Sequence, residues 1–165
     1  MTDRRHPNVV NAAEVEPRQV DQGQHRMTRR RLAAAAGARQ LGVSLCELAP
    51  GARSYPLHWH GANEEGIYVI SGRAIARIGA AEVPVGPGDY LAFPVGPDHA
   101  HQLVNDGDQP VVYLCVATDH RCEVVGYPDS NKIKVLAGPT WEDLWVDHTT
   151  RPEGSLDYWD GEPAA

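Results

Sequence analysis

The chain has 165 residues, of which 42% are hydrophobic, and a formal net charge of -7 at pH 7. This length favours one domain that buries about two-thirds of the surface the unfolded chain exposes. An acidic chain argues against general nucleic-acid binding, which needs a basic surface to neutralise phosphates. Nowhere do about eighteen apolar residues run together, so we expect no transmembrane helix and no membrane partner.

The N-terminal segment, residues 1–27, is polar and without apolar periodicity. It predicts an arm that is partly disordered or lies across a partner subunit. The basic triplet Arg29-Arg30-Arg31 is either an anion contact or, more often for such a run, a solvated edge. No apolar signal core follows the N-terminus and the three cysteines lack CxxC spacing, so we expect a cytoplasmic protein with reduced thiols.

Short strands predominate between residues 28 and 127, because the 16 glycines and 13 prolines of the chain favour turns over long helices. Residues 32–36 are either a short helix or a loop that leads into the sheet. Alternating patterns and brief apolar runs then predict strands separated by turns every eight to twelve residues or so. These strands cover residues 40–48, 58–60, 67–70, 74–78, 82–85, 90–93, 99–104, 111–116 and 122–125. The pattern predicts an all-β antiparallel sandwich or barrel.

Residues 128–165 form a C-terminal extension rich in tryptophan and acidic residues. The stretch 139–146 could form a short helix with Trp141 and Trp145 on one face. We expect the extension to pack its aromatic side chains onto the barrel or onto a second subunit; the alternative is a substrate lid. The predicted organisation is therefore an arm (1–27), a barrel (28–127) and this extension (128–165).

The stretch His58-Trp59-His60 carries the chemistry that stands out in the sequence. Two histidines separated by one residue lie on the same face of an extended strand. The apolar run 67–70 predicts a returning strand, which would bring a carboxylate from Glu64 or Glu65 opposite the two imidazoles. Two imidazoles and a carboxylate that converge on one point are a metal-site arrangement.

The spacing of these residues resembles the first motif of the cupin superfamily, G-x5-HxH-x(3,4)-E-x6-G. His58, His60, Glu65 and Gly72 match it, and the distance to Gly72 favours Glu65 over Glu64. One position departs from the motif, because six residues separate Gly51 from His58.

The second cupin motif, G-x5-PxG-x2-H-x3-N, resembles the stretch that begins at Gly88. Its proline, second glycine and histidine positions are matched by Pro94, Gly96 and His99. Leu103 occupies the asparagine position, so a polar role for that residue is not expected.

The resemblance implies a double-stranded β-helix (jelly-roll barrel) with an N-terminal arm and a C-terminal Trp-rich extension. It also implies one divalent transition metal (iron, manganese, zinc, nickel or copper) held by three histidines and one glutamate: His58, His60, Glu65 and His99. His101 follows His99 by two residues and should share its inward face, so we expect it to act as a catalytic proton-transfer group beside the metal.

Cupins with this ligand set include enzymes, so the resemblance implies a metal-dependent enzyme that acts on a small organic molecule. The expected reaction is of the dioxygenase type, an oxidoreduction, with isomerase or lyase chemistry close behind. The alternative is a non-catalytic cupin that binds a metal and a sugar or metabolite for binding or sensing. The polar arm, the tail and the pairing of barrels usual in the family predict a homodimer.

Overall fold

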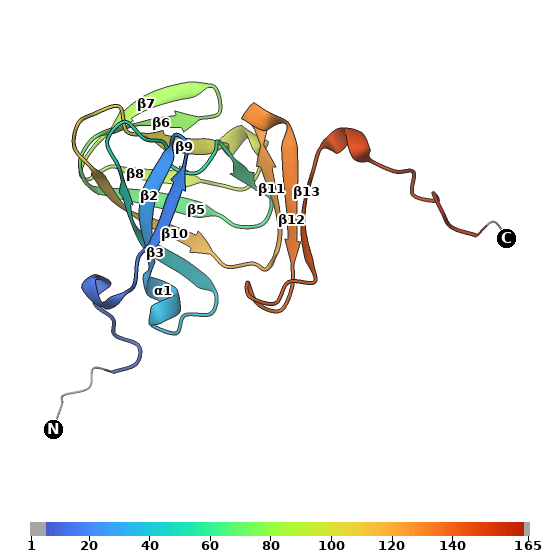
Figure 1. Ribbon diagram of the computed structural model, residues 1–165, viewed down its shortest axis with the longest axis horizontal. Coiled ribbons are helices and arrows are strands. Elements are labelled where there is room, and N and C mark those ends of the chain that lie inside the picture. Colours follow the sequence, from blue (N-terminus) through green and yellow to red (C-terminus); the bar gives the residue numbers. More distant parts are fainter. Residues whose placement is uncertain (1–5, 164–165) are drawn as a thin grey trace.

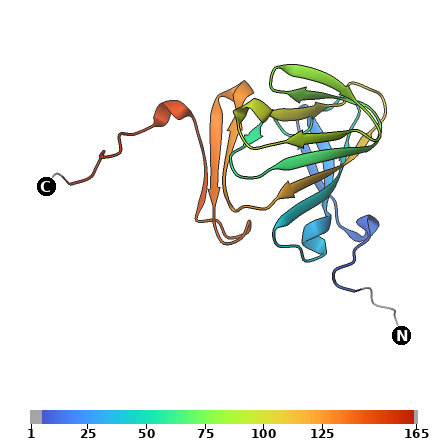
Figure 2. The same cartoon turned by 180° about the vertical axis from the view of Figure 1, so that it is seen from behind.

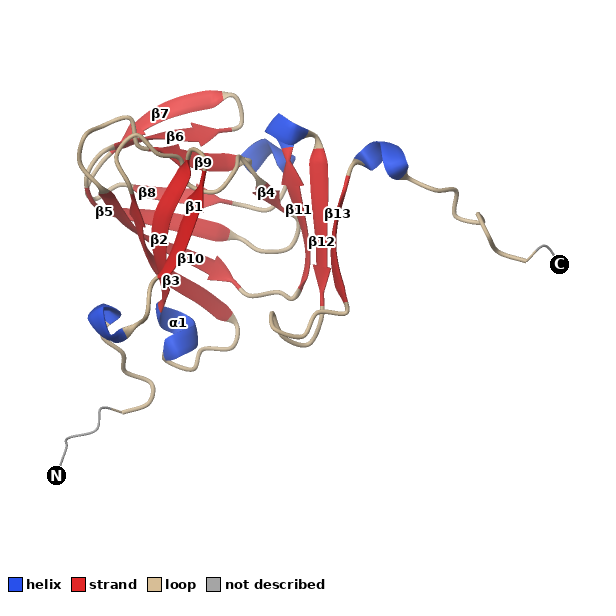
Figure 3. Ribbon diagram, in the orientation of Figure 1, coloured by secondary structure: helices blue, strands red, loops and turns tan. Residues whose placement is uncertain are grey.

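The computed structural model describes residues 6–163, and antiparallel strands make up almost all of its regular structure (Figures 1 and 3). The one α-helix in this part of the chain, α1 (Leu32–Ala35), is a single turn, and the other helical segments are short 3-10 turns. The all-β jelly-roll prediction is therefore confirmed. No helix in residues 6–163 has the length and apolar character that crossing a membrane requires.

Thirteen strands form three sheets in the described residues. The first sheet has the order β1-β2-β3-β10-β5-β8, the second β13-β12-β11-β4, and the third β7-β6-β9. The strands are β1 (Arg18–Gln22), β2 (His25–Arg31), β3 (Leu41–Leu48), β4 (Trp59–His60), β5 (Glu65–Ser71), β6 (Ala74–Ile78), β7 (Ala81–Val85), β8 (Tyr90–Phe93), β9 (His101–Val104), β10 (Val111–Thr118), β11 (Cys122–Tyr127), β12 (Lys132–Ala137) and β13 (Val146–Thr150).

Glycine turns set the ends of several central strands. Between β5 and β6 the chain turns at Gly72, whose φ of 82° lies in the left-handed region that favours glycine. A side chain at Gly72 would also collide with the carbonyl oxygen of Pro110. Such turns are visible in the sequence, which explains why β6 and β8 occupy the predicted ranges and the other predicted strands lie within a few residues of theirs.

The N-terminal segment departs from the predicted arm. Residues 18–31 form the β1–β2 hairpin, which extends the six-stranded sheet beside β3. Met27 is buried in the core cluster and Val20 packs against it, so the hairpin is part of the barrel. The sequence pattern did not predict these two strands, because most of their residues are polar. Arg18, Arg29 and Arg31 are polar even though they line the interior cavity described below.

The C-terminal extension also differs from the prediction. Strands β12 and β13 continue the sheet of β11, and the segment 139–146 does not form a helix. Trp141 instead lies in a loop, where its Nε1 donates a hydrogen bond to Asp119 Oδ1 over 2.6 Å. Residues 155–163 leave the barrel and project away from it (Figures 1 and 2).

The hydrophobic core lies inside the barrel and fills one part of it. Leu48, Val69, Leu103 and Val111 are its largest fully buried apolar side chains. The rest of the interior is a cavity of about 750 Å³ that is open to solvent. Inward residues of β2, β3, β5 and β10 line it, so this half of the barrel is shaped to hold a ligand.

Candidate metal centre

Four side chains converge in the wall of the cavity: His58, His60, Glu65 and His101. Each offers one nitrogen or oxygen atom, and these four atoms all lie within 4.8 Å of one another. We call these four residues the metal group. It draws on three regions of the chain: His58 precedes β4 and His60 ends it, β5 begins at Glu65, and β9 begins at His101.

Backbone pairing brings the two histidine-containing segments together. The His58 amide donates to the His101 carbonyl oxygen over 3.2 Å, and the His101 amide donates to the His58 carbonyl oxygen over 2.8 Å. The period of two along the chain then places the His58 and His60 rings on one side, with centroids 4.9 Å apart. Phe93 stacks on the His101 ring at 3.8 Å and fixes its plane.

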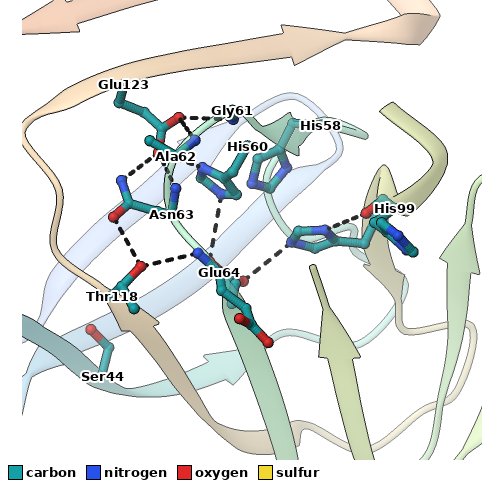
Figure 4. Close-up of polar contacts among 12 residues, drawn as sticks. Ser44, His58, His60, Gly61, Ala62, Asn63, Glu64, His99, Thr118 and Glu123 are labelled. Carbon is teal, nitrogen blue, oxygen red and sulfur yellow. Dashed lines mark hydrogen bonds and ion pairs between the residues drawn. The ribbon is translucent and has the colours of Figure 1, made fainter. Parts of the chain in front are cut away.

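The outer nitrogen of each imidazole, Nδ1, faces an oxygen atom. His58 Nδ1 lies 2.8 Å from the Pro56 carbonyl oxygen, and His101 Nδ1 lies 3.0 Å from that of His99. His60 Nδ1 lies 3.4 Å from Glu123 Oε2 (Figure 4). A proton on Nδ1 leaves Nε2 free as a ligand, which is the usual arrangement around metal-binding histidines.

The ionisation states of His58 and Glu65 suit a cation. Burial, together with the nearby His101, lowers the pKa of His58 to about 4, so this imidazole is neutral at neutral pH. Burial alone would raise the pKa of Glu65, but the neighbouring His101 and the other two imidazoles outweigh it and lower the pKa to about 2. Neutral imidazoles and an ionised carboxylate are the forms that ligate metals.

The chemistry of His60 gives a direct test of whether the residues fit a metal. Both of its ring nitrogens are buried; Nδ1 faces the Glu123 carboxylate at 3.4 Å, whereas Nε2 has no hydrogen-bond partner. Its Nε2 lies 3.7 Å from Glu65 Oε2, too far for a hydrogen bond and placed so that one ion could contact both. Three nitrogen donors and one carboxylate suit iron, manganese, zinc, nickel or copper, so the residues fit one divalent transition metal.

The structure places His101 in the metal group and His99 outside it, which corrects the sequence-based assignment of these two residues. His99 ends the 3-10 turn Pro97–His99, and Figure 4 shows its side chain away from His58 and His60. The turn adds two residues between Gly96 and the ligand position relative to the cupin motif. The His99 carbonyl oxygen instead lies 3.0 Å from His101 Nδ1. His101, for which the sequence predicted a proton-transfer role, is one of the four potential ligands.

Asn105 follows His101 at the H-x3-N spacing of the motif, so the expected absence of the asparagine is also corrected. This residue is 1% exposed. Its side-chain amide donates to the carbonyl oxygens of Leu48, Ala49 and Gln109, and its Oδ1 accepts from the Gly107 amide. Leu103, which the sequence comparison placed at the asparagine position of the second cupin motif, is an apolar core residue. The spacing from His101 to Asn105 was the signal that could have identified the fourth ligand.

Glu123 is a residue that the sequence did not reveal. From β11 it accepts hydrogen bonds from the amides of Gly61, Ala62 and Asn63 at 2.9–3.0 Å, and the Asn63 side chain also donates to it (Figure 4). Burial alone would raise its pKa, but the neighbouring His60 and these donors lower it to about 2. Glu123 therefore holds the loop between His60 and Glu65 and faces His60 with a negative charge. Only its inward alternation with Val125 could have indicated this.

Glu64 and Glu65 point in different directions, as the spacing to Gly72 indicated. Glu65 faces the metal group, whereas Glu64 is exposed and its amide donates to Thr118 Oγ1 over 3.0 Å. Tyr68, which alternates with Glu65, is exposed on the outer face of β5.

Comparison with known proteins gives both a family and a set of similar structures. A family model described as a cupin domain matches residues 44–117. No curated protein matches the sequence. Among solved structures, a sugar phosphate isomerase from a cupin superfamily, from Silicibacter pomeroyi, is 30% identical with a TM-score of 0.77. The match covers 92% of this chain and 98% of that protein.

Two further structures resemble the chain less closely in sequence. A protein of Acidithiobacillus ferrooxidans, provisionally named a sugar phosphate isomerase, is 23% identical over 92% of this chain and 96% of its own, with a TM-score of 0.80. The polyketide cyclase RemF of Streptomyces resistomycificus is 26% identical over 72% of this chain and 80% of its own, with a TM-score of 0.58. At these levels of identity the likeness concerns chiefly the fold.

Proposed function

Because the chain belongs to the cupin superfamily, we propose that the metal group binds one divalent transition metal and that the cavity above it isomerises a small organic molecule. The observation that carries this proposal is the convergence of four potential ligand atoms within 4.8 Å in the wall of an open cavity. A bound metal would supply Lewis-acid polarisation of a carbonyl or hydroxyl oxygen of the substrate.

The residues of the chain supply positioning. His58, His60, Glu65 and His101 lie in the wall of the cavity, and Phe93 stacks on the His101 ring. The Glu123 carboxylate keeps the His60 ring and the loop 61–63 in place. A substrate in this cavity would be held against the ligands on one side only, as a catalytic metal site requires.

The most similar sequence among the structures described above favours isomerisation over the dioxygenase-type reaction that we predicted first. The Silicibacter pomeroyi protein, at 30% identity, is named a sugar phosphate isomerase. Aldose–ketose isomerisation moves a proton between two neighbouring carbons and exchanges a carbonyl for a hydroxyl group, so it needs no external oxidant. We therefore place isomerase chemistry ahead of oxidoreductase and lyase chemistry for this chain.

The test is reconstitution of metal-free protein with iron, manganese, cobalt, nickel, copper or zinc, followed by assay against aldoses, ketoses and their phosphates. We expect metal-dependent interconversion of at least one pair, measured by NMR, and none with His101→Ala. Stoichiometric metal with tight sugar binding and no turnover would support the non-catalytic alternative. Metal content unchanged by His58→Ala combined with His101→Ala would reject the metal group itself.

A further inference from the structure

Four arginines line the same cavity as the metal group: Arg18, Arg29, Arg31 and Arg121. Arg121 is already engaged, because it lies 3.9 Å from Asp119 and donates to the Pro139 carbonyl oxygen. The other three lie on the β1–β2 hairpin. Arg29 and Arg31 are two residues apart on β2, so they share the inward face of the sheet. Arg18 of β1 lies directly opposite Arg29 in the hairpin register. Two like charges at directly opposed positions destabilise a strand pair, so this arrangement needs a compensating charge.

The described part of the chain offers little of that compensation. Arg29 Nε donates to Ser44 Oγ over 2.9 Å, and neither Arg29 nor Arg18 takes part in an ion pair among residues 6–163. Arg31 comes no closer than 3.8 Å to Glu142, whose side chain is 74% exposed. Ion pairs with such exposed partners contribute little to the stability of the folded chain.

The other acidic side chains of the cavity are already engaged. Glu65 belongs to the metal group, Glu123 is held by the loop 61–63, and Asp119 accepts from Trp141 Nε1. The thiol of Cys46, the register partner of Arg29, does not supply a negative charge, because burial raises its pKa to about 11. The guanidinium of Arg29 is thus a half-buried positive charge without an anionic partner in an otherwise acidic chain.

The arginines share one six-stranded sheet with Glu65 of the metal group. The strand order β2-β3-β10-β5 places Arg31 three strands from the β5 residues, through the register Arg31–Ser44–Cys115–Ile67. Three strand spacings correspond to about 14 Å between backbones. Arg29 and Glu65 both line the cavity, and its volume of about 750 Å³ is in the range of small-molecule sites.

We propose that Arg29, together with Arg18 and Arg31, forms an anion-binding subsite for the phosphate or carboxylate group of a small substrate whose other end faces the metal group. The second half of this inference rests on the proposed function; anion binding by the arginines does not. A guanidinium binds the oxygens of either anion in bidentate fashion, and the hydrogen bond to Ser44 orients that of Arg29.

The test uses full-length protein from which metal has been removed by a chelator, so that an anion cannot bind through the metal. Inorganic phosphate and acetate are titrated separately by calorimetry into the native protein, Arg29→Gln, Arg29→Lys and Arg18→Gln. Arg30→Gln is the matched control, because Arg30 precedes Arg31 on the same strand but does not line the cavity. Circular dichroism checks that each variant is folded.

We expect native protein to bind at least one of the two anions, and Arg29→Gln to weaken that binding about tenfold or more, the usual size of a lost charge-assisted pair. Arg29→Lys should lose less, and Arg30→Gln should remain within about twofold. Tighter binding of phosphate assigns a phosphorylated substrate, and tighter binding of acetate a carboxylated one.

Absence of binding to metal-free protein, or equal losses in Arg29→Gln and Arg30→Gln, would overturn the subsite. Metal content, measured on the same samples before chelation, reports on the proposed function separately. A protein that binds anion through Arg29 but holds no metal would reject the proposed function and retain the subsite. A protein that holds metal but does not bind anion through Arg29 would reject the subsite and retain the proposed function.

Discussion

The imidazole of His101 and that of His99 lie two residues apart, and only the first contributes to the metal group. We therefore expect His101→Ala to abolish stoichiometric metal binding, because it removes one of four donors and leaves the buried Glu65 charge less compensated. His99→Ala should retain the metal, since the His99 backbone carbonyl, which faces His101 Nδ1, is unchanged. Elemental analysis of the two purified variants decides between them. Retention of metal by His101→Ala with loss by His99→Ala would restore the ligand set predicted from sequence.

Glu123 acts on His60 from outside the metal group, and its removal should weaken the site without destroying it. The two carboxylate oxygens of Glu123 accept from three backbone amides, and Glu123→Gln replaces one of these oxygens with an NH₂ group, so that a donor faces at least one backbone donor. We expect metal affinity to fall about 10- to 100-fold and the free energy of unfolding to drop by about 1–3 kcal/mol. Competition with a chelator and urea denaturation measure the two effects.

The matched control for Glu123 is Glu47→Gln, since Glu47 is exposed on β3. It should change neither the metal affinity nor the stability measurably. If Glu123→Gln also leaves metal affinity unaltered, the carboxylate serves only the loop 61–63 and does not tune His60.

Sequence patterns predicted three members of the metal group, because His58, His60 and Glu65 lie close together in the sequence and the spacing of the two histidines places them on one face. The hairpin predicted for this stretch is not formed, since β4 pairs with β11 whereas β5 pairs with β8 and β10. The fourth was missed for a local reason. The turn Pro97–His99 displaces the ligand by two residues, and counting along the motif does not reveal whether extra residues are present. Glu123 was missed because its contacts with residues 61–63 depend on how β11 pairs with β4, which no local pattern specifies.

At the level of elements, the central strands were predictable from the turn residues between them. The outer strands β1, β2 and β13 were not predicted, because their residues are mostly polar or exposed. Gly72 and Gly88 adopt positive φ and mark strand ends plainly. The β1–β2 hairpin carries arginines on its inward face because that face lines a cavity, so it lacks the apolar alternation that identifies a half-buried strand. The strand β13 was missed for a similar reason, since four of its five residues are exposed.

Asn105 joins the end of β9 to the end of β3, and this junction should be sensitive to substitution. Asn105→Ala leaves the carbonyl oxygens of Leu48, Ala49 and Gln109 without their side-chain donor and opens a small buried void. We expect a loss of about 2–4 kcal/mol in the free energy of unfolding, measured in urea. Asp108→Ala, an exposed change in the same turn, should cost less than about 0.5 kcal/mol. Similar losses in the two variants would show that the amide does not bridge the strands.

At the scale of the whole molecule, the segment after β13 carries apolar side chains that no part of residues 6–163 covers. Leu156, Tyr158 and Trp159 are all at least 70% exposed on a segment that projects from the barrel. Exposed clusters of this kind usually mark an interface, so we predict a homodimer in which the segment packs on a second copy of the chain. Light scattering should give the mass of two chains, and removal of residues 151–165 should give a monomer. A native monomer, or a dimer unaffected by the truncation, would contradict this prediction.

A metal at the proposed site would connect parts of the barrel that otherwise meet through few backbone bonds. β4 belongs to one sheet, β5 to a second and β9 to a third, and each contributes to the metal group. Because an ion that binds only the folded chain stabilises it by mass action, metal at about 100 times its dissociation constant contributes about 2.7 kcal/mol. For a domain of this size that corresponds to about 5–10 °C in Tm. We expect chelation to lower Tm by this amount and the matching ion to restore it, as followed by differential scanning calorimetry. His99→Ala should show the same shift and His101→Ala none; a Tm that chelation leaves unchanged in the native protein would mean that the metal group is not occupied.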